Sequence, residues 1–180
     1  QKYPKHERLN YAHFLLAICY YEQIVDEKKD IGPLLNAQKE FKFIIKNYPD
    51  SDFALDSRFK LDLINDVLAS KEIFLGRYYM KKEKWIAAIN RFKQVVQFYD
   101  TTIYIEEALH RLVELHYRIG LIDEAKKYAK LLGYNYQSSK WYEATYIIFN
   151  KDYDSPIRKI NKNKKKGNFI IRKFKSLFEL

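Results

Sequence analysis

Small and apolar residues recur along this chain at the spacing of paired amphipathic helices. In each of three stretches they fall three or four positions apart, pause at a polar turn and then resume. This periodicity predicts helical hairpins. The repeating positions are Ala17, Tyr20, Ala37, Phe41, Ile44 and Pro49, then Leu75, Gly76, Tyr79, Ala88, Phe92 and Val95, and then Tyr117, Ala125, Ala129 and Leu132.

A helix–turn–helix unit of about 34 residues is the tetratricopeptide pattern. In residues 69–102 we expect Gly76 and Ala88 to lie where the two helices cross, because only small residues let two backbones approach closely. Tyr79 and Phe92 then fill the space beside the crossing, and Ala125 takes the small-residue position in the last hairpin. Such units stack to bury their apolar faces. The sequence therefore predicts an all-α tetratricopeptide-repeat solenoid of about three repeats over residues 1–149, with a concave surface suited to binding.

Turn residues divide this pattern into seven expected helices. Pro49 ends one helix and Asp50 or Ser51 caps the next, while Gly120 and Gly133 are expected to stop two later ones. No Gly-Pro break occurs within 52–82, which indicates one long helix or two with a slight kink near Asn65. The expected ranges are 8–25, 34–47, 52–82, 84–98, 103–118, 122–132 and 138–149.

Three connections between these helices have distinctive sequences. Gly32 and Pro33 mark a first loop that is longer than a tetratricopeptide turn. Residues 100–102 form a turn with a capping hydroxyl, and Ser138–Ser139 opens the last helix.

The net charge of +10 is unevenly spread. Residues 151–180 hold ten Lys or Arg and three acidic residues, so this tail carries +7 and the rest of the chain only +3. A nearly balanced body argues against a nucleic-acid-binding solenoid. No apolar run approaches the ~18 residues that a membrane-spanning helix needs.

The tail 150–180 reads as a basic linker followed by a short amphipathic helix over 168–178. Its apolar stripe is suited to a membrane, a nucleic acid or a partner groove. The simpler alternative is a helix that folds back on the last hairpin beside Tyr142, Tyr146 and Ile147. The apolar stripe comprises Ile170, Ile171, Phe174, Leu177 and Phe178.

Residues with catalytic or metal-binding chemistry are sparse. The sequence lacks a Gly-rich phosphate loop, and the four histidines form no His-Glu-x-x-His pair. The acidic pairs at 106–107 and 123–124 fall in first turns of helices, where they favour the helix dipole. We therefore expect no catalytic residue, metal or cofactor, and no enzyme. Cys19 follows a stretch that resembles a lipoprotein cleavage box, but Ile18 stands where such a box needs Gly or Ala, so we expect a buried structural cysteine.

Several sequence blocks resemble the BamD family, the tetratricopeptide lipoproteins of the outer-membrane β-barrel assembly machinery. The likeness runs in order over residues 1–149 and includes the long first loop. The blocks include Tyr20–Ile24, Tyr48–Ser51, Gly76–Tyr79, Ala87–Phe92, Glu106–Leu109 and Leu131–Gly133.

This resemblance implies a non-catalytic periplasmic scaffold at the outer membrane. It would dock the POTRA domains of the barrel-forming subunit, BamA, hold smaller accessory lipoproteins and help deliver unfolded outer-membrane proteins. Family members begin with a lipidated cysteine and two further repeats, which would precede this segment. The lipid would provide the membrane association. The resemblance places Arg91 toward the barrel-forming partner, and we expect partner contacts at Arg91, Asn90, Lys93 and Glu106. An intramolecular pair with a nearby acid is the alternative role of Arg91. For the whole chain, the alternative is a generic tetratricopeptide adaptor that binds an extended peptide.

Overall fold

The structure, a computed structural model, describes residues 8–23 and 31–150. Over these residues it contains helices and no strand, so the predicted all-α class is confirmed. The helices are α1 (Leu9–Tyr21), α2 (Gly32–Asn47), α3 (Asp52–Lys81), α4 (Trp85–Phe98), α5 (Ile105–Arg118), α6 (Ile122–Asn135) and α7 (Lys140–Phe149).

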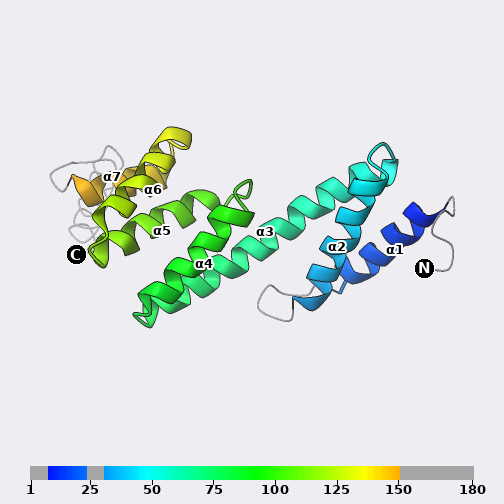
Figure 1. The fold of residues 1–180 in the computed structure, drawn as a ribbon, viewed down its shortest axis with the longest axis horizontal. Coiled ribbons are helices and arrows are strands. Elements are labelled where there is room, and N and C mark those ends of the chain that lie inside the picture. The colour runs from blue at the N-terminus through cyan, green and yellow to red at the C-terminus, as the bar shows by residue number, and fades with distance from the viewer. Residues whose placement is uncertain (1–7, 24–30, 151–180) are drawn as a thin grey trace, which may run out of the picture.

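Consecutive helices pair into three hairpins, α1–α2, α3–α4 and α5–α6, which pack in a row. Figure 1 shows an elongated arrangement with α1 and α2 at one end and α5, α6 and α7 at the other. Helix α7 packs mainly on α5 and also touches α6. This order is that of a short helical-repeat solenoid, in which each unit contacts its neighbours.

Helix α3 spans 30 residues without a break and joins the two ends of the row (Figure 1). Its first half packs into a core with α1 and α2, and its second half into a core with α4 and α5. Leu68 belongs to the first core and Ala69 to the second, so adjacent residues are both buried. The buried face of α3 therefore changes direction at this step, and a single helix serves two bundles.

Several helix ends follow from their sequences. The Ser51 hydroxyl accepts a hydrogen bond from the Ala54 amide at 3.2 Å, and the Ser139 hydroxyl accepts one from the Tyr142 amide at 3.0 Å. Each satisfies a backbone donor that the first turn leaves unpaired. Gly120 ends α5 with a φ of 86°, a conformation that glycine adopts readily.

Five helix boundaries differ from the sequence prediction by two residues or more. Helix α1 ends at Tyr21, four residues before the predicted end, and α5 and α7 each begin two residues later than predicted. Helix α2 begins at Gly32 with Pro33 in its first turn, because the missing proline N–H has no partner there in any case. Helix α6 continues past Gly133 to Asn135. A Cβ at Gly133 would lie 2.9 Å from the Tyr142 ring, so this glycine makes room for α7 instead of ending α6.

One side-chain prediction was wrong. Cys19 is exposed, since it lies on the outer side of α1 while Ala17 faces the core. The turn at 100–102 does contain a capping hydroxyl: Thr102 donates to the Tyr99 carbonyl at 2.7 Å and so satisfies the end of α4. The predicted linker and amphipathic helix of the tail lie outside the described residues.

Candidate partner-binding site

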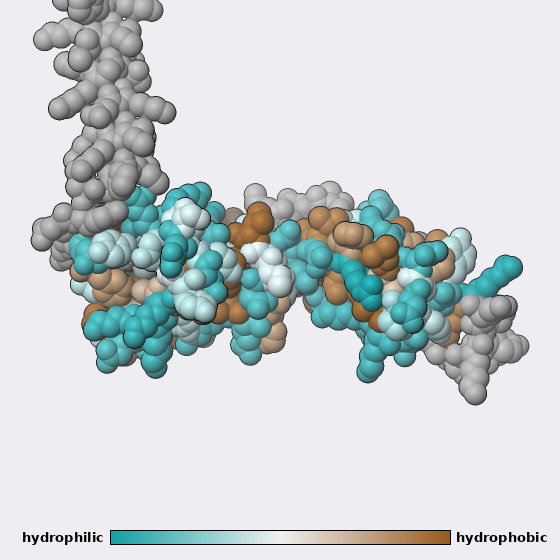
Figure 2. Space-filling model, turned by 90° about the horizontal axis from the view of Figure 1, so that it is seen from above, coloured by the Kyte–Doolittle hydropathy of each residue, from teal (hydrophilic) through white to brown (hydrophobic). Residues whose placement is uncertain are grey.

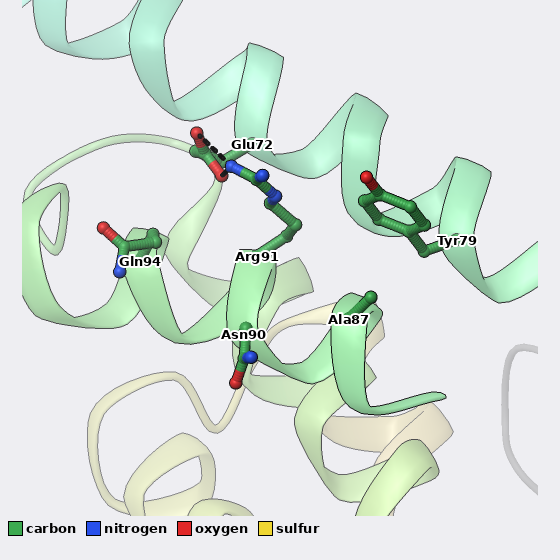
Figure 3. Close-up of a pocket in the computed structure, with 6 residues that line it drawn as sticks. All are labelled: Glu72, Tyr79, Ala87, Asn90, Arg91 and Gln94. Carbon is green, nitrogen blue, oxygen red and sulfur yellow. Dashed lines mark hydrogen bonds and ion pairs between the residues drawn. The ribbon is translucent and has the colours of Figure 1, made fainter. Parts of the chain in front are cut away.

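The surface between α3 and α4 contains a cavity of about 350 Å³ (Figure 3). Helix α3 contributes Glu72 and Tyr79 to its lining, one turn on either side of Gly76. Helix α4 contributes Ala87, Asn90, Arg91 and Gln94.

The close approach of α3 and α4 positions this cavity. Gly76 is buried against Phe92, and a Cβ at Gly76 would lie 2.6 Å from the end of that ring. Ala88 and Phe92 are completely buried, and the half-buried Tyr79 packs against the same core. Arg91 adjoins Phe92 in the sequence, so its guanidinium emerges beside the crossing. In the last hairpin, Ala125 is buried in the same way on α6.

Arg91 makes a long contact with Glu72 across the two helices. Its Nη1 lies 3.3 Å from one carboxylate oxygen and 3.5 Å from the other. Charge-assisted N–H···O bonds normally measure about 2.7–2.9 Å, so this pair is loose. The Arg91 side chain is 40% exposed and that of Glu72 is 19% exposed. The intramolecular pair weighed from the sequence is therefore present, in a weak form.

The four predicted partner-binding residues do not gather at one site. Arg91 and Asn90 line the cavity, with Asn90 pointing away from Glu72 (Figure 3). Lys93 lies toward α6: the pKa of Glu124 is lowered chiefly by its hydrogen bond from Lys127, and Lys93 adds to this effect. Glu106 is half-buried in the first turn of α5. It lies near Tyr136, whose pKa is raised mainly by burial and further by this carboxylate.

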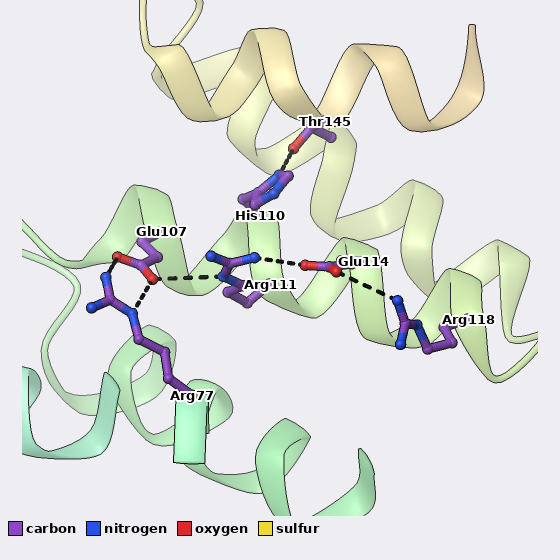
Figure 4. A network of polar contacts seen from close by, with 7 residues as sticks. All are labelled: Arg77, Glu107, His110, Arg111, Glu114, Arg118 and Thr145. Carbon is purple, nitrogen blue, oxygen red and sulfur yellow. Dashed lines mark hydrogen bonds and ion pairs between the residues drawn. The ribbon is translucent and has the colours of Figure 1, made fainter. Parts of the chain in front are cut away.

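A second polar cluster ties α3 to α5 (Figure 4). Arg77 donates to both oxygens of Glu107, with its Nε 2.7 Å from Oε1. This hydrogen bonding raises the pKa of Arg77, while burial opposes the shift. The Glu107 side chain is only 7% exposed. The first-turn position of Glu107 was correctly read from the sequence, but its role as a buried ion-pair partner was missed.

The cluster continues along α5 through Arg111, Glu114 and Arg118. Arg111 Nη1 lies 2.8 Å from Glu114, and Arg118 lies 3.9 Å from the same carboxylate. The Arg111 Nε is buried without a hydrogen bond, 3.6 Å from Glu107. These residues are three or four positions apart, a spacing that favours such pairs on one helix face. The sequence therefore carried a signal for this row, although it carried none for the Arg77 link.

The two histidines of α5 have structural partners. His110 Nδ1 lies 2.8 Å from the Thr145 hydroxyl of α7, and its ring packs on Trp141. Burial lowers the pKa of His110 to about 4. His116 Nδ1 lies 2.7 Å from the Leu112 carbonyl. Within residues 8–23 and 31–150, no group of three His, Cys, Asp or Glu side chains is arranged to hold a metal ion.

Comparison with known proteins places this fold in a family. The family model described as "YfiO: Outer membrane lipoprotein" matches residues 1–131. The chain belongs to the YfiO family. Two curated relatives are both named outer membrane protein assembly factor BamD. The Rickettsia prowazekii protein is 45% identical over 153 residues, which make up 85% of this chain and 61% of that protein. The Caulobacter vibrioides protein is 43% identical over 148 residues, or 82% of this chain and 48% of that protein.

These matches confirm the family resemblance read from the sequence. This YfiO-family chain spans about half to three fifths of the length of these two relatives. In its described part, no helix combines the length and the apolar composition needed to cross a bilayer.

Proposed function

We propose that this YfiO-family chain is a non-catalytic scaffold for outer-membrane protein assembly. It would act at the periplasmic face of the outer membrane and dock the POTRA domains of the barrel-forming subunit at the α3–α4 cavity. The names of its relatives and the family description support the assembly role. The observation that carries the docking site is the loosely held Arg91 beside that cavity.

Arg91 retains most of its hydrogen-bonding capacity. A guanidinium has five N–H donors in a planar fork, and only Nη1 faces Glu72, at 3.3–3.5 Å. A carboxylate from a partner can therefore engage the fork in bidentate fashion while Glu72 stays nearby. The fork is suited to this role because arginine matches the planar geometry of carboxylates.

The cavity around Arg91 supplies the contacts that would surround such a pair. Tyr79 provides an aromatic wall, while the amides of Asn90 and Gln94 offer donors and acceptors. An arginine anchor beside an aromatic wall is typical of residues that dominate binding energy at interfaces. Accessory lipoproteins and unfolded outer-membrane proteins would engage other surfaces of the scaffold.

The uninterrupted α3 favours this function over a generic peptide-binding adaptor. Ordinary tetratricopeptide arrays break into short helices of similar length, whereas α3 covers 30 residues and serves two bundles. A helix shared by two bundles joins the hairpins in one continuous row, which suits a scaffold for a domain-sized partner.

The test is the affinity of the full 180-residue chain for purified soluble POTRA domains, measured by calorimetry. Arg91→Glu should weaken binding by about 2 kcal/mol, roughly 30-fold, because it replaces the fork with a like charge facing the partner carboxylate. Helical content should not change. Glu72→Gln should bind as well as the wild type or better, because it removes the internal competitor.

The matched control is Lys126→Glu, which changes the net charge equally at an exposed site on α6. Its binding should stay within about twofold of the wild type, since Lys126 does not line the cavity and salt screens exposed surface charges. If Lys126→Glu and Arg91→Glu weaken binding equally, or if neither does, the α3–α4 cavity is not the docking site.

A further inference from the structure

Helix α3 carries a long apolar stripe that belongs to neither of its two cores. The stripe residues are between 47% and 62% exposed. On the edge of the molecule shown in Figure 2, hydrophobic side chains gather near the middle and over the α1–α3 end. Single exposed apolar residues are ordinary, but a contiguous set on one helix marks an interaction surface. The stripe consists of Leu55, Phe59, Leu63, Phe74 and Tyr78.

These residues share one face of α3. Leu55, Phe59 and Leu63 follow one another at intervals of four, and so do Phe74 and Tyr78. Residues four apart lie one above the other on a helix. Between the two groups the same face carries Val67, which is half-buried against the first core, and the half-buried Ser70. At 1.5 Å per residue, a 30-residue helix is about 45 Å long, so the stripe is long enough for a second helix.

The two halves of α3 differ in the net sign of their exposed charges. The first half presents three acids, Asp52, Asp56 and Asp62, and one base, Arg58, which donates to the Pro49 carbonyl. The last turns present Lys81 and Lys82, together with Arg77, whose half-exposed guanidinium also binds Glu107. The half-buried Lys60 and Glu72 lie against the Tyr21 ring and Arg91.

The charges of one α3 helix are complementary to those of a second α3 helix that runs in the opposite direction. We propose that the stripe binds a second copy of this chain, with the two α3 helices antiparallel about a two-fold axis beside Asp66 and Val67. In this register acidic residues face basic ones and the large apolar residues come together. Along the shared face the register places Asp52 opposite Lys81, Asp56 opposite Arg77, Phe59 opposite Phe74 and Leu63 opposite Ser70. A two-fold interface makes each of these contacts twice.

The opposite orientation is disfavoured by the same charges. A parallel second copy would set the acidic halves side by side and the basic halves side by side. Like charges in juxtaposition suppress wrong arrangements and so fix direction and register. A partner of different sequence would need an apolar stripe of its own and charges in the order opposite to that of α3. A second, antiparallel copy of α3 provides both.

A cavity beside the middle of α3 gives the second copy a place to insert a side chain. It measures about 360 Å³ and is lined in part by Val67, Ser70 and Tyr104. Because Leu63 of the second copy lies opposite Ser70, its side chain can fill this space. The register also brings the two Asp66 carboxylates close together at the axis. Asp66→Asn should therefore tighten the dimer.

The first test is the mass of the full 180-residue chain by sedimentation over a wide range of concentration. We expect it to rise from 21.8 kDa to twice that value. Asp52→Lys or Lys81→Asp alone should raise the dimer Kd by roughly tenfold or more, because each creates two repulsive pairs. An equal mixture of the two variants should restore the wild-type Kd, since both pairs are then opposite in sign. A monomer at every concentration, or a dimer insensitive to these reversals, would overturn the proposal.

A cross-link locates the interface. In a Cys19→Ser background, Val67→Cys should form an intermolecular disulfide, because the two residues 67 meet near the axis. The matched control is Ile86→Cys on α4, which is 63% exposed and lies off the stripe. A dimer in which Ile86→Cys cross-links and Val67→Cys does not would place the interface elsewhere and contradict the proposal.

Discussion

Two arginine–glutamate pairs connect α3 to the helices that follow it, and they differ in geometry and in the burial of the glutamate. Arg91 touches Glu72 through one nitrogen at 3.3–3.5 Å, and both side chains are partly exposed. Arg77, which is 52% exposed, holds Glu107 with two nitrogens, and the Glu107 side chain is 7% exposed. The same two residue types therefore form one loose contact and one tight contact in the same solenoid.

The difference shows how burial assigns a role to an ion pair. The exposed Arg91–Glu72 pair gains little, because water screens it and two flexible side chains must be ordered. It remains available for exchange with a partner. In the second pair the Glu107 carboxylate is almost fully buried and Arg77 is half-exposed. Removing Arg77 would leave a buried charge with less compensation, so Arg77–Glu107 acts as a link between α3 and α5.

The strongest test of this contrast is Glu107→Ala. It should lower the free energy of unfolding by about 3 kcal/mol, the lower end for a buried pair, because Arg77 and Arg111 are partly exposed and can relax into water. Urea unfolding monitored by circular dichroism measures the change. Glu114→Ala, whose side chain is 28% exposed, serves as the control and should cost clearly less. Equal losses would remove the distinction between buried and peripheral members of the cluster.

Ala88→Leu tests whether the helix crossing supports the loose pair. The larger side chain should overpack the crossing of α3 and α4 and cost about 2 kcal/mol of stability. It should also displace Arg91 from Glu72 while leaving Arg77–Glu107 intact. The melting temperature gives the first effect and a crystal structure the second. An unchanged melting temperature would show that Ala88 does not lie at a tight crossing.

The pH dependence of stability tests how strongly His110 is shielded from water between α5 and α7. The pKa of His110 is about 4 in the folded chain, against about 6.5 for a free imidazole. Below 6.5 the unfolded chain binds the proton more readily, so stability falls as the pH drops through this window. Between about pH 7.5 and 5.5 the loss from His110 should be about 1 kcal/mol. The His110→Gln variant should lack this part of the pH dependence. Unfolding free energies that vary identically with pH in the variant and the wild type would contradict the prediction.

The smallest effect is expected for the loose pair itself. Arg91→Gln and Glu72→Gln should each change the free energy of unfolding by less than about 0.5 kcal/mol, because the pair is exposed and long. Denaturant titration of both variants beside Glu107→Ala puts the two pairs on one scale. A loss above about 1 kcal/mol from either would mean that the Arg91 pair also holds the fold together.

Much of the fold could be predicted from local patterns. The periodicity of 52–82 indicated a long helix, and Ser51, Ser139 and Gly120 marked boundaries through caps and backbone conformation that act within a few residues. Gly133 and Cys19 were misread because their environments depend on residues outside their own helix. Gly133 is set by the ring of Tyr142 on α7, and the exposure of Cys19 is set by the orientation of α1.

The candidate site was only partly predictable. A likeness in sequence drew attention to Arg91 and Asn90, but it could not show that Lys93 and Glu106 lie in different surroundings. The charged residues along α5 are three or four positions apart, so the sequence alone reveals that they can pair. Arg77 and Glu107 are 30 residues apart, and the sequence gives no sign that they meet.

The sequence by itself determined the all-α class, the hairpin order and the length of α3, because helix formation, capping and amphipathic spacing depend on neighbours within a turn or two. The tertiary structure decided that Glu107 is almost fully buried and held by two arginine nitrogens, whereas Glu72 meets Arg91 only through a long contact. Burial is a property of how α3, α4 and α5 pack, and it sets the dielectric environment on which the strength of each ion pair depends.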